Sequence, residues 1–276
     1  MNNPADPLAS LQLHSLTNDL KLWCEPKQIR LTSNNLIIQS IDQCGSDITQ
    51  ASTQILKTGI RRHVIRVNTS EGPLVIKSFP FTKLKEKLKY KKYGLAEISN
   101  NIKARQLGIP APHYYAYFES RRFGLVTANG CIMNFLCNQY PLEDICKNDN
   151  KLLYIAIPVL TELFKKGVNH IDISPTNIFF TGDKTNFCII DWQYCSFHKP
   201  NDPLQLVVQA AHFLRGIKTD LNHDLRSKWL AQLYQSSNPD ISKHSFLTAI
   251  STLQSNKLSI KDRLALNFDR ATLFGQ

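Results

Sequence analysis

The stretch that decides the fold is His170–Phe180, which reads HIDISPTNIFF. Asp172 follows the histidine by two residues, Asn177 follows Asp172 by five, and a short apolar run comes directly afterwards. Asp, Ser, Pro, Thr and Asn are ordinary turn residues, so the stretch by itself predicts only a polar turn before a buried strand. Its neighbours along the chain decide whether it is more than a turn.

A second apolar run, FCII, follows after the turn-like segment TGDKTN and ends in Asp191. Two short strands joined by such a turn predict a hairpin, and its two open ends would bring Asp172, Asn177 and Asp191 into one small space. Hard divalent cations take oxygen ligands of this kind, and Mg²⁺ bound to nucleotide phosphates needs only one or two from the protein. A carboxylate that does not bind metal can orient an attacking hydroxyl or accept its proton.

The chain upstream of this stretch is rich in strand patterns. A short strand is expected over residues 35–41, and HVIRV and LVIKSF predict a β-hairpin because the turn-like NTSEG separates them. Residues 82–108 are rich in helix formers and end at Gly108, which predicts one or two helices. FGLVTANGCIMNFL is expected to form two further strands with a turn at Asn129–Gly130.

The chain downstream of Pro141 has a helical character. KLLYIAIPVLTELFKKG repeats its apolar residues with a helical period, with Pro158 expected to kink the helix and Gly167 to end it. From Pro203 to the end the chain reads as several helices. Strands therefore dominate the first half and helices the second, which predicts an α+β protein with two lobes, residues 1–140 and residues 141–276.

Composition narrows the class of partner and the compartment. A net charge of +11 over 276 residues indicates an anionic partner, which is nucleic acid, an anionic membrane surface or a phosphorylated substrate. The seven cysteines are scattered without a CxxC pair, which gives a zinc site no support and predicts free thiols in a reducing cytosol. The start lacks a secretory pattern and no apolar run approaches the roughly 20 residues that span a bilayer, so we expect a cytoplasmic protein.

The motifs together resemble those of the protein-kinase-like superfamily. HIDISPTN resembles its catalytic loop H-x-D-x-x-x-x-N, and IIDWQ resembles its metal-binding D-F-G segment. PLVIKSF resembles the strand with the nucleotide-binding lysine, here Lys77, and YGLAEISNNIKARQLGIPAP resembles the helix that follows, with Glu97 or Glu86 as the partner of the lysine. The resemblance covers about residues 50–215 and implies a two-lobed fold, in which an antiparallel-sheet lobe with one main helix precedes a mostly helical lobe and ATP lies in the cleft.

The resemblance also implies a role for each of these residues. Lys77, held by Glu97, would contact the nucleotide phosphates, and Asn177 and Asp191 would hold Mg²⁺. Asp172 would orient the acceptor hydroxyl and take its proton. The implied cofactors are ATP and Mg²⁺, and the implied activity is the ATP-dependent transfer of a phosphoryl group to a hydroxyl.

Within the superfamily, GIPAP and the bare IDW resemble the bacterial lipopolysaccharide core kinases. These enzymes phosphorylate Kdo or heptose sugars of lipid A–core precursors at the inner membrane, so we expect an inner-core sugar as acceptor and peripheral contact with the cytosolic face of that membrane. Two alternatives stay open: a cytosolic small-molecule or antibiotic kinase, and a kinase-like ATP-binding module with weak or no catalysis.

Two departures from the superfamily pattern bear on activity. No glycine-rich G-x-G-x-x-G precedes the lysine strand, where KTGIRRHVIRV has only Gly59. Arg61 and Arg62 are read first as solvated strand ends, and the alternative is that one of them supplies some of the missing charge. Ile171 stands where regulated protein kinases carry the arginine that reads activation-loop phosphorylation. The second departure predicts a site that works without a phosphorylation switch.

The segment KLKEKLKYKKYG concentrates six lysines between Lys83 and Lys92. It is either a solvated helix face or a surface that contacts anionic lipid headgroups, to which Leu84, Leu88 and Tyr90 would add shallow apolar contact. Beyond charge the chain has no signature of RNA or DNA binding, so nucleic acid is not an expected partner.

Overall fold

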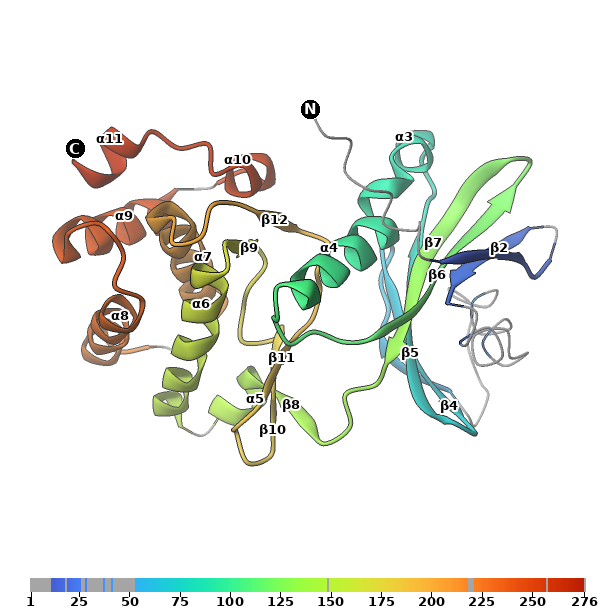
Figure 1. Ribbon diagram of the computed structural model, residues 1–276, viewed down its shortest axis with the longest axis horizontal. Helices are drawn as coiled ribbons and strands as arrows, with labels where there is room; N and C mark the ends of the chain where they lie inside the picture. The colour runs from blue at the N-terminus through green and yellow to red at the C-terminus, as the bar shows by residue number, and fades with distance from the viewer. Residues whose placement is uncertain are drawn as a thin grey trace. The chain divides into compact units, whose positions relative to one another are not determined.

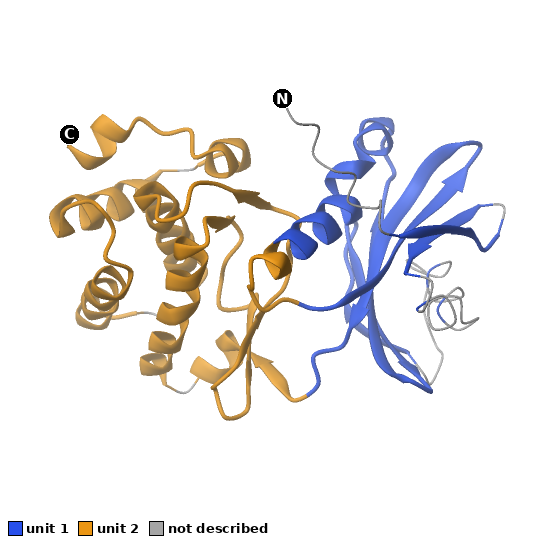
Figure 2. Ribbon diagram, in the orientation of Figure 1, with its two compact units in different colours: residues 1–103, 112–137 blue, residues 104–111, 138–276 orange. Residues whose placement is uncertain are grey.

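A computed structural model describes residues 11–17, 19–25, 28, 37, 41, 53–147, 149–217, 221–256 and 258–275. The chain divides into two compact units, of residues 1–103 and 112–137 and of residues 104–111 and 138–276 (Figure 2). The strand expected over residues 35–41 lies largely outside the described residues, and the two described positions in it, Ile37 and Ile41, are helical.

The first unit is built on an antiparallel sheet, whose described strands run in the order β1-β2-β6-β7-β5-β4-β3. The strands are β1 (Gln12–Ser15), β2 (Leu20–Cys24), β3 (Thr53–Lys57), β4 (His63–Thr69), β5 (Gly72–Pro80), β6 (Tyr114–Arg122) and β7 (Leu125–Asn134). The helical elements are α3 (Leu84–Leu88), the 3₁₀-helix η2 (Tyr90–Lys92) and α4 (Gly94–Gln106). The predicted hairpin is β4–β5, and α4 lies along one face of the sheet (Figure 1).

The turn predicted at Asn129–Gly130 is wrong. β7 continues through both residues, and the β6–β7 hairpin turns at Phe123–Gly124, whose φ angles of 50° and 77° have the positive sign that a type I′ turn needs. Gly130 serves a close approach instead, because a Cβ there would lie 2.1 Å from the Lys77 carbonyl oxygen and 2.5 Å from the Phe118 ring. The dipeptide that favours a turn is therefore used here for packing two strands next to the lysine.

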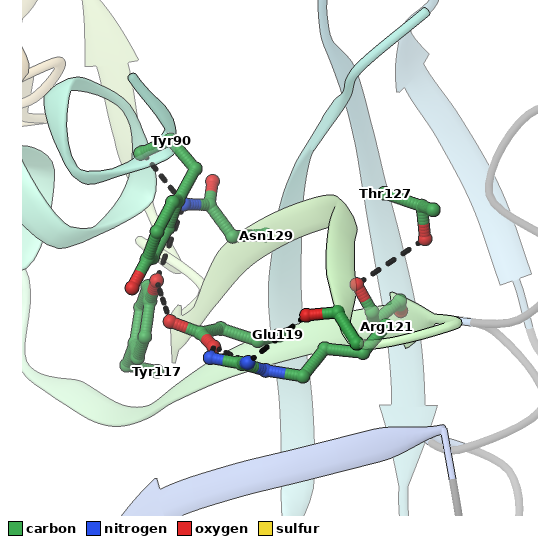
Figure 3. A network of polar contacts seen from close by, with 8 residues as sticks. Tyr90, Tyr117, Glu119, Arg121, Thr127 and Asn129 are labelled. Atoms are coloured by element: carbon green, nitrogen blue, oxygen red, sulfur yellow. Dashed lines mark hydrogen bonds and ion pairs between the residues drawn. The ribbon is translucent and has the colours of Figure 1, made fainter. Parts of the chain in front are cut away.

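A network of polar side chains on β6 and β7 fixes the start of α4 against the sheet (Figure 3). Asn129 accepts a hydrogen bond from the first N–H of α4 at 3.2 Å and donates one to the Tyr90 carbonyl at 2.8 Å. The Tyr117 hydroxyl donates to Glu119 at 2.9 Å, and the other oxygen of that carboxylate pairs with Arg121 at 2.5 Å. Burial, and then the charge of Glu119, raises the pKa of Tyr117 far above its usual range, so this hydroxyl remains a donor.

Gly130→Ala is expected to destabilise the protein by about 1–3 kcal/mol, because the added methyl group meets a backbone carbonyl that no rotamer change can move. The free energy of unfolding in denaturant measures the loss. Gly182→Ala is the matched control, since a Cβ at Gly182 meets nothing within 4 Å. Equal stability of the two variants would show that the contact between β5 and β7 at this point is not tight.

The second unit is mostly helical, with α6 packed on α7 and α8, and α7 packed on α9 (Figure 1). Its helical elements are α5 (Leu142–Cys146), the 3₁₀-helix η3 (Asn150–Ile155), α6 (Ala156–Lys165), α7 (Pro203–Arg215), α8 (His223–Ser237), α9 (Lys243–Ser255), α10 (Ile260–Ala265) and α11 (Arg270–Phe274). Its strands are β8 (Gln139–Pro141), β9 (Val168–His170), β10 (Ile178–Thr181), β11 (Phe187–Ile189) and β12 (Cys195–Phe197).

The structure replaces the kinked helix expected around Pro158 with two elements. The 3₁₀-helix η3 ends at Ile155, and Pro158 stands in the first turn of α6, where its missing N–H costs no intrahelical hydrogen bond. Gly167 follows α6 with a φ of 67°, as expected for a helix stop. Within the described part of the chain, no helix combines the length and the hydropathy that a membrane crossing requires.

Candidate active site

The first unit contains a buried ion pair between Lys77 and Glu97. The two residues are 4% and 0% exposed, and Lys77 Nζ lies 2.7 Å from Glu97 Oε2. The other carboxylate oxygen of Glu97 accepts a hydrogen bond from the Tyr114 hydroxyl at 2.8 Å. Glu86, the alternative partner, instead accepts a hydrogen bond from the Lys83 N–H at the start of α3. A buried ion pair is weak evidence for stability, because desolvation offsets most of its attraction, and this pair is better explained by a function of the lysine.

The alternation of side chains along β5 explains how the pair forms. Lys77 shares a sheet face with Val75, because residues two apart in a strand point to the same side. Val75 packs in one apolar cluster with Ile98 of α4. Since Glu97 directly precedes Ile98 in the helix, the packing that covers this face also brings the carboxylate to the lysine.

In the second unit, β10 and β11 form the predicted hairpin and bring Asn177 and Asp191 to its open end. The strands pair antiparallel, and beyond them the Ile190 N–H donates to the Asn177 carbonyl at 3.0 Å. The Asn177 side-chain amide donates to the backbone carbonyl of Asp172 at 2.9 Å. Its amide oxygen then has no hydrogen bond to any residue that the structure describes and is free to act as a ligand.

Asp191 has an unusual backbone conformation. Its φ is 66°, in the left-handed region, which non-glycine residues adopt uncommonly and Asp and Asn more readily than most. Residues held in such conformations concentrate at active sites, where the surrounding structure holds them in place. The conformation therefore supports a functional reading of Asp191.

The oxygens at the hairpin end fit Mg²⁺. A carboxylate from Asp191 and an amide oxygen from Asn177 are hard donors, and Mg²⁺ at nucleotide sites takes one or two protein ligands and completes its shell with phosphate oxygens and water. Among the described residues, no group of three or more His, Cys, Asp or Glu side chains is placed to hold a metal ion.

His170 joins the catalytic-loop segment to the segment before Asp191. It is fully buried, its Nε2 donates to the Ile190 carbonyl at 3.1 Å, and its ring meets the Trp192 ring edge-on with centroids 4.9 Å apart. These contacts hold the end of β11 against the strand that leads to Asp172. The histidine has a structural part in the site.

The side chain of Asp172 is 45% exposed. Its Oδ1 lies 3.3 Å from Nε2 of His212, a residue of α7. The Nδ1 of His212 lies 2.9 Å from Nη1 of Arg263, a residue of α10. The sequence motifs did not point to His212 or Arg263, and the one available signal was a histidine in the largely apolar run PLQLVVQAAHFLR.

The comparisons with known proteins bear on the fold. No protein-family model matches the chain, and no curated protein matches its sequence. Among solved structures 1194 chains match. One, described as WaaP in complex with acyl carrier protein, has a TM-score of 0.57 and 12% sequence identity over 90% of this chain and 99% of that one.

Two structures of WbdD, one described as a bifunctional kinase-methyltransferase, have TM-scores of 0.44 and 0.47 and identities of 19% and 20%. They match 77% and 82% of this chain, which spans about half of their length, 45% and 50%. At these identities the likeness is one of fold. The WaaP match and the order of elements confirm the predicted α+β, protein-kinase-like fold, with an antiparallel-sheet unit and a mostly helical unit.

Proposed function

We propose that this protein is an ATP-dependent phosphotransferase that acts on a hydroxyl group, with an inner-core sugar of lipopolysaccharide, Kdo or heptose, as acceptor. The observation that carries the proposal is the hydrogen-bonded end of the β10–β11 hairpin, where Asn177 bonds to the backbone of Asp172 and to the residue before Asp191. The buried pair of Lys77 and Glu97 supplies the second half of the machinery.

Each residue then has one task in the transfer. Lys77, held extended by Glu97, binds the nucleotide phosphates, and Asp191 and the amide oxygen of Asn177 hold Mg²⁺. Bound Mg²⁺ supplies positive charge that offsets the charge on the phosphates. Asp172 accepts the proton of the acceptor hydroxyl as its oxygen bonds to the γ-phosphorus, and ADP leaves with the electrons of the broken phosphoanhydride bond. The first lobe, residues 1–140, thus binds nucleotide, and the second, residues 141–276, performs the chemistry.

The choice of acceptor rests on the motifs GIPAP and IDW and on the net charge of +11, which suits a phosphorylated glycolipid. One observation favours a second candidate, a kinase-like module that binds ATP with little catalysis. The loop between β3 and β4, residues 58–62, has a single glycine, and its neighbour Ile60 is almost fully exposed. Such a loop cannot wrap phosphates with successive backbone amides as a three-glycine loop does.

Nucleotide binding and turnover separate these candidates. We expect Mg-ATP to raise the unfolding temperature of the protein, and turnover of ATP to rise when a lipid A–core precursor is added. Stimulation by an aminoglycoside or a small alcohol in place of the lipid would favour a soluble-acceptor kinase. Binding without turnover for any acceptor would favour the module, and absence of binding would contradict all three.

The lysine-rich surface of the first unit, formed by α3 and η2, is proposed to contact the cytosolic face of the inner membrane. Leu84 and Leu88 lie one helical turn apart and are 62% and 71% exposed, and Lys85, Lys89 and Lys91 around them are exposed as well. Exposed leucines within a ring of lysines suit an anionic lipid surface, where the lysines meet headgroups and the leucines enter the interface.

Replacing Lys85, Lys89 and Lys91 with Gln is expected to weaken binding to vesicles of mixed anionic and zwitterionic phospholipid by about 100-fold, since each lysine contributes about 1 kcal/mol near such a surface. Vesicle sedimentation at low salt measures the change. The control replaces three exposed lysines of the second unit, Lys147, Lys151 and Lys165. A similar loss in the control would show that net charge alone, and no particular surface, drives the contact.

A further inference from the structure

We propose that His212 and Arg263 are positioning residues that orient the Asp172 carboxylate, Arg263 through its hydrogen bond to His212 and His212 through the contact of its ring with the carboxylate. The proposal rests on the proposed function, in which Asp172 accepts the proton of the acceptor hydroxyl. It assigns a task to α7 and α10, the helical part of the chain in which no motif was found.

The chemistry of arginine fixes the state of the imidazole. A guanidinium group has only N–H donors, so His212 Nδ1, which lies 2.9 Å from Arg263 Nη1, must accept and carries no proton. The ring proton of the neutral imidazole is therefore on Nε2, the nitrogen that lies 3.3 Å from Asp172 Oδ1. Arg263 thus selects the one neutral tautomer that can hold the carboxylate.

Arg263 is itself held in place by the strand that leads to Asp172. Its Nη1 also donates to the Ile171 carbonyl at 3.0 Å, and its own carbonyl accepts a hydrogen bond from the Asn169 side chain at 2.9 Å. Burial lowers the pKa of Arg263, and the charge of Asp172 acts in the opposite direction.

The arrangement holds the base without pairing it directly with a cation. His212 lies against one oxygen of Asp172, and the second oxygen has no hydrogen bond to any residue in the described part of the chain, so it remains available to the acceptor hydroxyl. A guanidinium bonded directly to Asp172 would favour the charged carboxylate and weaken it as a base. A neutral imidazole between them orients the carboxylate at a smaller cost in basicity, and orientation of this kind is a large part of catalysis.

Two variants of His212 test the role in turnover. His212→Leu is expected to lower kcat for Mg-ATP turnover by about 10- to 100-fold with little change in the KM for ATP, as loss of an orienting partner typically does. His212→Gln, whose amide nitrogen can take the place of Nε2 as donor, should keep most of the rate. Loss of rate in both variants to the same degree, or in neither, would overturn the proposal.

A double variant separates this proposal from the proposed function. If His212 acts through Asp172, His212→Leu causes no further loss in an Asp172→Asn background. Full turnover by Asp172→Asn alone would overturn the assignment of the base. An inactive Asp172→Asn protein together with a fully active His212→Leu protein would overturn only the role of His212.

The tautomer gives a readout that needs neither activity nor a known acceptor. Long-range ¹⁵N–¹H spectra of the folded wild-type protein should show His212 with its proton on Nε2 alone, and Arg263→Met should convert it to a mixture of tautomers. A wild-type ring protonated on Nδ1, or a spectrum unchanged in Arg263→Met, would contradict the chain. This measurement decides the proposal even if His212→Leu fails to fold.

Discussion

Replacing Asp172 with Asn is expected to lower phosphoryl transfer by about 10²- to 10⁴-fold, the usual contribution of a general base, while Mg-ATP still binds. The amide has the shape of the carboxylate and its oxygen can keep the same contact with His212, so the loop should keep its conformation. Stability should change little, because the side chain is nearly half exposed. Steady-state turnover, with nucleotide binding followed by thermal shift, measures both effects.

The control for this variant is Asp240→Asn, which removes the same charge from an exposed position of the same unit. It should leave turnover at the wild-type rate. If Asp172→Asn also kept the wild-type rate, Asp172 would not be the base, and the transfer would have to use another group to accept the proton.

Lys77→Met is expected to affect both stability and activity. Without the ammonium group, the Glu97 carboxylate stays buried and keeps its hydrogen bond from Tyr114, but it has no cation beside it. Breaking a buried ion pair in this way lowers the free energy of unfolding by about 3–5 kcal/mol. Loss of a charged donor to the phosphates should lower kcat by about 10²- to 10³-fold, as removal of one preorganised donor does. Denaturant unfolding and ATP turnover measure the two effects separately.

The double variant Lys77→Met/Glu97→Gln separates the loss of stability, which comes from the buried unpaired carboxylate, from the loss of turnover, which comes from the missing lysine. A neutral amide can accept from Tyr114 without a buried charge, so stability should return to within about 1–2 kcal/mol of wild type. Turnover should stay low, because the phosphates have no lysine to meet. Recovery of turnover along with stability would mean that the pair serves the fold and not the nucleotide.

Local patterns predicted those parts of the fold that depend on neighbouring residues. The β4–β5 hairpin, the helix ending before Gly108 and the β10–β11 hairpin follow from periodicity and turn chemistry, and the structure contains all three. The turn at Asn129–Gly130 failed because the same dipeptide fits a type I′ turn and a close approach between strands. Only the position of β5 next to β7 decides between the two uses.

The residues of the candidate site also divide into those that a local pattern predicted and those that depend on contacts between distant parts of the chain. Asp172, Asn177 and Asp191 were predicted because their spacing within one short segment is itself a signal, and the structure bonds Asn177 to the backbone of Asp172 and of the residue before Asp191. Their roles stay a prediction. His212 and Arg263 lie far along the chain from Asp172, on helices whose packing no short pattern encodes. Long-range contacts made by single polar residues on apolar helices leave little trace in a sequence.

Ile171 is the residue from which the sequence predicts activity without a phosphorylation switch. The side chain that replaces the phosphate-reading arginine of regulated kinases is buried, its N–H donates to the Tyr194 carbonyl at 3.2 Å, and its carbonyl accepts from Arg263. The position is thus part of the core beneath the catalytic loop. Activity without a phosphorylation switch stays a prediction, which full turnover by protein free of phosphate would support.

Transfer of labelled γ-phosphate from ATP, in the presence of Mg²⁺, to a lipid A–core precursor mixed with competing soluble acceptors tests the central claim most directly. The account predicts label on a hydroxyl of the core sugar with the wild-type protein, and at least about 100-fold slower labelling with Asp172→Asn under the same conditions. Label on a soluble acceptor alone would move the protein to another class of kinase. No label on any acceptor, from a folded protein saturated with Mg-ATP, would contradict the claim that this site transfers phosphate.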